Sequence, residues 1–126
     1  MRNAEPRQRL DPSGAGLASV RTHVKVFHWQ THKYGHHKAL NKLFVRLEEL
    51  NDTCVEICMG HFGRPRFREG DVIRLENIAK PRRFCRRAAQ QLALLRRAFP
   101  NQTDLQNVLD SIIGALWRSA YLLSLE

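Results

Sequence analysis

Two histidines and two carboxylates are the residues of this chain whose types and spacing suit them to bind a metal ion. His28 lies in the run Phe-His-Trp, His37 follows nine residues later, and Asp52 and Glu56 are four residues apart. Imidazole nitrogens and carboxylate oxygens bind ferrous iron, and they also suit zinc and manganese. We therefore treat these four residues as candidate metal ligands.

The spacing of these residues predicts that one chain cannot complete the site. If residues 35–61 form one helix, Asp52 and Glu56 lie one turn apart on one face. His37 lies 15 residues before Asp52, which leaves about 60° of rotation but roughly 22 Å along the helix axis. Two such helices, packed antiparallel about a two-fold axis near residues 45–47, bring His37 of one chain level with both carboxylates of the other. We therefore expect two equivalent sites between two chains.

Each of these residues also fits a purely structural role. Asp52 and Glu56 alone are compatible with solvated carboxylates on a helix face, and His37 with a polar helix start. The familiar di-iron bundles place a Glu-x-x-His motif on each of two helices, so that the site lies inside one subunit. No Glu-x-x-His occurs in this sequence. A metal site in this chain is therefore again expected between subunits.

Hydrophobic residues at helical spacing predict an all-α fold. We expect helices at about 11–33, 35–61, 81–99 and 102–125. Residues 62–80, which combine glycines with proline–arginine pairs, are expected to form a long crossover that returns the chain to the far end, with a short helix near 71–78. Two helix pairs joined by one long crossover make a ferritin-like four-helix bundle. The bundle would span residues 11–126, after a flexible basic tail at residues 1–10.

The positions expected to face the core follow from the same spacing. In the first helix they are Leu17, Val20, Val24 and Phe27. In the third helix they are Phe84, Ala88, Gln91, Leu92, Leu95 and Phe99. Cys54 and Cys58, one turn apart on the second helix, are interpreted as small core residues and not as metal ligands.

Length and composition agree with one domain in a reducing compartment. The chain has 126 residues, of which 43% are hydrophobic, enough to build a core. Its three cysteines form no Cys-x-x-Cys pair, which favours an intracellular protein over a disulfide framework. The polar start carries no signal-peptide core, and no apolar run is long enough to cross a membrane. We expect no membrane partner.

Several motifs of the sequence resemble the Dps-type mini-ferritins. The run Phe-His-Trp-Gln-Thr at 27–31, the His-Lys-Ala at 37–39 and the Asp-x-x-x-Glu at 52–56 resemble the ferroxidase region of that family. The segments 105–117 and 122–126 resemble its last helix, so the likeness spans nearly the whole chain. The run Met-Gly-His-Phe-Gly-Arg at 59–64 makes the chain more similar still to short Dps-like proteins of large DNA viruses of eukaryotes.

This resemblance implies a function and an assembly. His28 and His37 of one subunit, with Asp52 and Glu56 of its two-fold mate, would bind Fe(II) and oxidise it, preferentially with hydrogen peroxide. The ferric mineral would grow inside a hollow dodecamer. Trp29 would lie beside the site, although a large aromatic on a helix is as often a core residue.

The resemblance has one departure, at the first histidine. His28 and His37 are nine residues apart, fewer than the family pattern suggests, so the turn after the first helix must be tight. We expect Tyr34 and Gly35 to turn the chain. His32 and His36 are the substitutes if His28 does not reach the site.

Charge points to an anionic partner. The formal net charge is +9, and no acid occurs between Asn77 and Thr103. Arginines gather in the tail, in the crossover and at the start of the third helix: Arg2, Arg7, Arg9, Arg64, Arg66, Arg68, Arg82, Arg83, Arg86 and Arg87. We expect these surfaces to bind DNA non-specifically through its phosphates. The alternative is that individual arginines pair with acids across subunit contacts.

Three functional hypotheses follow. The first is a ferroxidase that stores iron and associates with DNA, and it is the one we favour. The second is a DNA-compacting shell whose metal site is structural or vestigial. The third is a structural component of a virion or other particle. The third hypothesis predicts that the purified protein forms no closed hollow shell. We expect a homo-oligomer built from two-fold dimers.

Overall fold

Amphipathic stretches of the sequence form four helices. The computed structural model describes residues 15–76 and 78–125, and its helices are α1 (Ala15–Gln30), α2 (Tyr34–Phe62), α3 (Pro81–Arg96) and α4 (Thr103–Leu123). No strand occurs within these described ranges. The predicted all-α, four-helix fold is therefore confirmed. None of the described helices is long and apolar enough to span a lipid bilayer.

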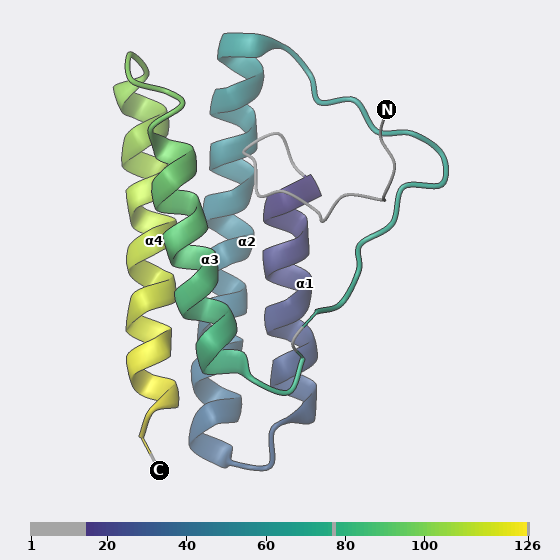
Figure 1. Ribbon diagram of the computed structural model, residues 1–126, viewed down its shortest axis with the longest axis vertical. Coiled ribbons are helices and arrows are strands. Elements are labelled where there is room, and N and C mark those ends of the chain that lie inside the picture. Colours follow the sequence, from purple (N-terminus) through teal and green to yellow (C-terminus); the bar gives the residue numbers. More distant parts are fainter. Residues whose placement is uncertain (1–14, 77, 126) are drawn as a thin grey trace.

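The helices form two antiparallel hairpins, α1–α2 and α3–α4 (Figure 1). Between them the chain runs back along the length of the bundle, so that α2 and α3 point the same way (Figure 1). Helix α4 packs against both α2 and α3, and α1 packs against α2 and touches α3. This single long crossover separates the topology from a simple up-and-down bundle.

The core follows the apolar stripe of each helix. On α1 the buried residues Leu17, Val20, Val24 and Phe27 recur every three or four positions, the period of one helix face. They join the buried leucines of the other helices in one cluster. Truncating a buried leucine such as Leu47 to alanine typically costs 2–5 kcal/mol of stability, because it leaves a cavity.

The first hairpin turn lies earlier in the chain than expected. Helix α1 ends at Gln30 and α2 begins at Tyr34, so residues 31–33 make the turn, and Gly35 is already helical. The Lys33 backbone N–H donates to Thr31 Oγ1 at 3.2 Å. At the other end of α2, Gly63 caps the helix at φ 91°, a conformation that other residues adopt only with strain.

The second hairpin and the crossover also depart from expectation. Helix α3 ends at Arg96, before the expected residue 99, and Gln91 is exposed instead of facing the core. Residues 71–76 and 78 contain no helix, so the described part of the expected short helix at 71–78 is not formed. The expected basic tail at residues 1–10 lies outside the described residues.

A buried histidine holds the crossover against α1. His23 is 2% exposed; its Nδ1–H donates to the Ser19 carbonyl at 2.7 Å, and its Nε2 accepts the Glu76 backbone N–H at 2.8 Å. The ring stacks on Phe84 with the centroids 4.5 Å apart. Because one ring nitrogen faces an acceptor and the other a donor, His23 is a neutral imidazole.

Candidate metal centre

The tight first hairpin turn brings His28 and His37 into direct contact. His28 lies in the last turn of α1 and His37 in the first turn of α2. Their imidazole rings stack with centroids 3.8 Å apart and planes at 24°. The nine-residue spacing is therefore sufficient to pair the two side chains.

Reciprocal hydrogen bonds fix the orientation of both rings. The Nδ1 atom of His28 lies 2.9 Å from the His37 carbonyl, and Nδ1 of His37 lies 3.0 Å from the His28 carbonyl. A carbonyl oxygen only accepts, so each Nδ1 carries a hydrogen. In the neutral ring Nε2 then keeps its lone pair. Histidines that bind metals are commonly held in this way, with the second nitrogen bonded to a carbonyl or carboxylate.

The two substitute histidines lie elsewhere. His32 is exposed in the hairpin turn. His36 is half-buried, and its Nε2 lies 2.7 Å from the Leu125 carbonyl, to which it donates. Both line a cavity of about 360 Å³ that neither His28 nor His37 lines. The structure thus groups His28 with His37 and leaves His32 and His36 apart from that pair.

Trp29 lies on the surface. Its side chain is 68% exposed, so the core role considered for it is wrong. The Lys25 ammonium lies 5.8 Å from the centroid of its ring. An indole this exposed next to His28 in the chain leaves a large apolar area for another molecule to cover.

Asp52 and Glu56 lie together on α2, toward the opposite end from His37. Both are exposed and line a cavity of about 560 Å³ between α2, the start of α1 and crossover residues 67–73. Arg21 and Arg68 line the same cavity, so its charge is mixed. Within the described residues of one chain, no group of three His, Cys, Asp or Glu side chains is arranged to hold a metal ion.

One polar residue of this cavity has no equivalent among the sequence predictions. Asn51 is 5% exposed, and its Nδ2 donates to the Leu17 carbonyl at 3.0 Å, joining α2 to the start of α1. Its Oδ1 is buried without a hydrogen-bond partner in the described part of the chain. The signal was available in the sequence, because an asparagine at a core-facing helix position needs a buried partner.

An exposed stripe runs along α2 from the histidine end to the carboxylate end. Its members lie within about 100° of one another around the helix, by the 100° step per residue. They are Tyr34, His37, Asn41, Val45, Glu48, Asp52 and Glu56, all exposed. Val45, near the middle of the stripe, is 58% exposed. The stripe therefore has an apolar centre, with histidine toward one end and carboxylates toward the other.

The cysteine thiols are unsuited to bind metal. Burial, with Cys58 nearby, raises the pKa of Cys54 to about 12. Burial likewise raises the pKa of Cys85 to about 12. Metals bind the thiolate and not the thiol, so both behave as small apolar residues, as predicted for Cys54.

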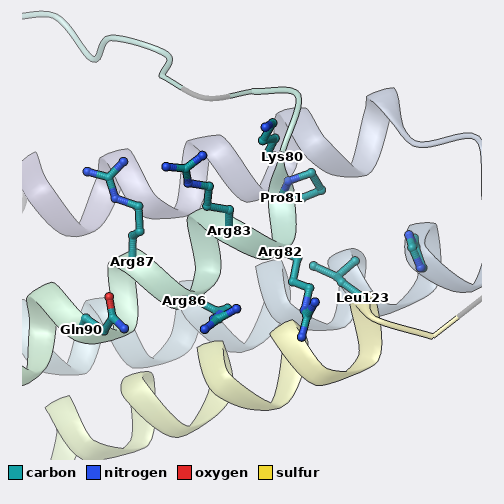
Figure 2. A pocket seen from close by; sticks show the side chains of 9 residues that line it. Lys80, Pro81, Arg82, Arg83, Arg86, Arg87, Gln90 and Leu123 are labelled. Carbon is teal, nitrogen blue, oxygen red and sulfur yellow. The ribbon is translucent and has the colours of Figure 1, made fainter.

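The arginines form two different surfaces. Arg64, Arg66 and Arg68 are exposed along the crossover. Those at the start of α3 line a cavity of about 720 Å³, shown in Figure 2: Arg82, Arg83, Arg86 and Arg87, with Lys80. Arg2, Arg7 and Arg9 lie outside the described residues.

These features define a four-helix bundle with a pair of oriented histidines at one hairpin turn and a basic cavity at the start of α3. The chain belongs to DUF5856, a family of unknown function, whose profile matches residues 28–123. That match includes all four candidate metal ligands.

A phage protein is similar over most of the chain. It is the uncharacterized 14.6 kDa protein in the mobD-ri intergenic region of Enterobacteria phage T4, 27% identical over 113 residues, which cover 87% of this chain and 84% of the phage protein. No solved structure matches. A viral relative is thus established, and the descriptions of the family and of the phage protein name no activity.

Proposed function

We propose that this protein is a Dps-like mini-ferritin that oxidises Fe(II) between two subunits and stores the ferric product in a hollow oligomer, a dodecamer by resemblance. His28 and His37 of one subunit would bind the iron with Asp52 and Glu56 of the two-fold mate. Hydrogen peroxide is the preferred oxidant by the same resemblance.

The reciprocal hydrogen bonds of the histidine pair carry this proposal. Each Nδ1–H is bonded to the other residue's carbonyl at 2.9–3.0 Å, so both Nε2 lone pairs remain for a cation. The two rings also stack with centroids 3.8 Å apart, which holds the two Nε2 atoms on neighbouring rings. Purely structural surface histidines do not require this arrangement.

The exposed stripe on α2 supports the arrangement of two subunits. An antiparallel partner centred near Val45 covers an apolar residue and brings each His37 level with the other chain's Asp52 and Glu56. Trp29 and Tyr34, which are 68% and 73% exposed, would be partly covered by the same contact. The ligand set would then contain two imidazoles and two carboxylates, suited to ferrous iron.

The protein residues hold and orient iron as a substrate in this reaction. Each Fe(II) loses one electron, and one peroxide accepts two electrons and two protons to give two waters. The carboxylates balance the added positive charge when Fe(III) forms, because opposite charges attract more strongly in a partly desolvated site. The backbone-held imidazoles keep their ligating nitrogens aimed without reorganisation.

Paired variants test the site. Asp52→Asn with Glu56→Gln, and separately His28→Ala with His37→Ala, are expected to lower peroxide-driven Fe(II) oxidation by more than about 100-fold, since both remove ligands and not only their supports. The control is Glu49→Gln with Asp110→Asn, which removes two carboxylates from exposed ion pairs worth little stability. Oxidation that is unchanged in the first two variants would sink the assignment.

Mixing the two inactive variants tests whether the site is shared. A mixed dimer has one intact site and one that lacks all four ligands. Random mixing makes half the dimers mixed, so activity should recover to about a quarter of the wild-type value. A site within one chain predicts no recovery, and that result would contradict the two-subunit arrangement.

The alternative is a DNA-compacting or virion shell protein whose metal site is structural or vestigial. The exposed arginines Arg64, Arg66 and Arg68 of the crossover favour some nucleic-acid association. Retention on DNA that does not fall as salt rises would exclude phosphate-dominated binding. A zinc- or manganese-loaded site without oxidation activity would favour this alternative over the ferroxidase.

A further inference from the structure

The basic cavity at the start of α3 has a distinct charge arrangement. Its cationic side chains come from one turn and a half of the helix and from the residue before it: Lys80, Arg82, Arg83, Arg86 and Arg87. Figure 2 shows Arg83 and Arg87 leaving α3 on one side, and Arg82 and Arg86 on the side of α4. The cavity is thus bordered by two rows of guanidinium groups.

No acid among the described residues pairs with these cations. No Asp or Glu lines the cavity, and none of its five cationic side chains forms an ion pair within the described part of the chain. Elsewhere arginines do find acids: Arg96 Nε lies 2.7 Å from Asp110 Oδ1, and Arg46 lies 3.0 Å from Glu49. Like charges one turn apart destabilise a helix slightly. The missing partner is therefore expected to be an external anion.

The backbone at the start of α3 adds to the positive electrostatic potential of the cavity. Helix α3 begins at Pro81 with no side-chain cap and no acid in its first turn. Its first free N–H groups and the positive end of its dipole consequently face the same region as the guanidinium groups. This contribution alone would not make a site, but here it reinforces five side-chain charges.

The two-row arrangement selects the kind of anion. Because the two rows leave α3 on different sides, an anion with several linked phosphates can contact more of the guanidinium groups than a single phosphate can. Three linked phosphates carry about four negative charges near neutral pH, close to the five positive charges of the cavity lining. Duplex DNA presents its phosphates along a rod, at one charge per about 1.7 Å of axis, and suits an extended surface better than a cavity of about 720 Å³.

We propose that the cavity formed by Lys80 and the four arginines at the start of α3 binds a compact chain of linked phosphates, as found in inorganic polyphosphate or a nucleoside triphosphate. Gln90 adds an amide, and Leu123 and Pro81 add apolar surface. The guanidinium fork matches phosphate oxygens in bidentate geometry. This site lies within one chain and does not depend on the proposed iron chemistry.

Calorimetric titration of the full chain with tripolyphosphate tests the proposal. Arg82→Gln with Arg86→Gln, and separately Arg83→Gln with Arg87→Gln, should each weaken binding by about tenfold or more, because each pair removes two charge-assisted contacts. The control, Arg46→Gln with Arg97→Gln, removes the same charge away from the cavity and should change affinity by less than about twofold. Circular dichroism of each variant checks that the helices remain.

Several results would overturn the proposal. Equal loss in the control variant would mean that general charge, and not the cavity, attracts the anion. Inorganic phosphate that binds as tightly as tripolyphosphate would contradict the two-row argument. Duplex DNA that binds more tightly than tripolyphosphate, and loses affinity in the same variants, would make this surface a nucleic-acid interface.

A comparison of two ligands identifies the source of the linked phosphates. Tighter binding of adenosine triphosphate than of tripolyphosphate supports a nucleotide, and the reverse order supports inorganic polyphosphate. The His28→Ala, His37→Ala variant should bind tripolyphosphate as the wild type does. Loss of Fe(II) oxidation with intact anion binding therefore separates failure of one site from failure of the other.

Discussion

The histidine pair and the basic cavity lie at the same end of the bundle but are suited to ions of opposite charge. His28 and His37 each donate an Nδ1–H to the other's carbonyl, which fixes the orientation of both rings. The four arginines at the start of α3 are permanently charged, and no Asp or Glu of the described residues lines their cavity. The first arrangement is suited to a cation and the second to an anion.

Adjacent residues on α2 separate these two regions. His36 lines the basic cavity and donates to the Leu125 carbonyl, whereas His37 stacks on His28. One residue step turns a helix by about 100°, which is enough to aim neighbouring imidazoles into different surroundings. Two sites of opposite preference can therefore share one end of a small bundle without competing.

Replacing His36 and His37 one at a time with alanine is expected to give the largest difference in Fe(II) oxidation between the two regions. His37→Ala is expected to lower Fe(II) oxidation by about 100-fold, because it removes one ligand and the imidazole that stacks on His28 and donates to its carbonyl. His36→Ala should change oxidation by less than about twofold. Stopped-flow absorbance of the ferric product measures both. Equal losses would show that the whole hairpin turn matters and that the two histidines are not distinct.

A charge at Val45 should separate the two regions by their dependence on assembly. Val45→Glu places two like charges close together at the expected two-fold axis, which should weaken the dimer by about tenfold or more. Fe(II) oxidation should fall with it, while tripolyphosphate binding, which needs one chain, should persist. Sedimentation velocity follows the dimer, and Val45→Thr is the control of similar shape. Dimers that survive the charge would place the axis elsewhere.

The smallest effect is expected at the opposite end of the bundle, away from both regions. There His61 Nε2 lies 3.1 Å from both carboxylate oxygens of Asp104. This hydrogen bond, followed by that from the Leu105 N–H, lowers the pKa of Asp104. A lowered folded-state pKa gives stability that is present above the unfolded value, about 3.9, and is lost as pH falls through the lower folded value.

Asp104→Asn should therefore lower the thermal midpoint slightly at neutral pH. The difference from the wild type should shrink as the pH falls through the lowered folded-state pKa of Asp104, where the wild-type carboxyl also becomes protonated. Thermal melts followed by circular dichroism at neutral and at acid pH measure it. A difference that stays constant with pH would assign the effect to packing. Iron oxidation and anion binding should not change.

Helical periodicity was sufficient to predict most of the core. Leu17, Val20, Val24 and Phe27 are buried as their spacing predicted. The prediction that Gln91 faces the core was wrong because the buried face of α3 is narrow. That face consists of Cys85, Ala88, Ala89 and Leu92, and residue 91 falls at its edge. Periodicity locates a face but not its width.

The site was predictable in its residue types and not in its local geometry. The spacing indicated that His37 and the carboxylates of one chain lie far apart, and the structure separates them. The contact between His28 and His37 depends on a turn of three residues, 31–33, whose conformation no hydrophobic pattern specifies. His23 lies on the same stripe as Val20, Val24 and Phe27, but its bond to the Glu76 N–H depends on the path of the crossover.

The length of α2 sets the distance between the two iron sites of the proposed dimer. Its histidine and carboxylate levels are separated by about 17 residues, from position 37 to the midpoint of 52 and 56, and the two-fold axis lies halfway. The two iron sites of a dimer are then roughly 25 Å apart along the helix. No single ion or small oxidant reaches both sites at once, so the two sites of each dimer should react independently.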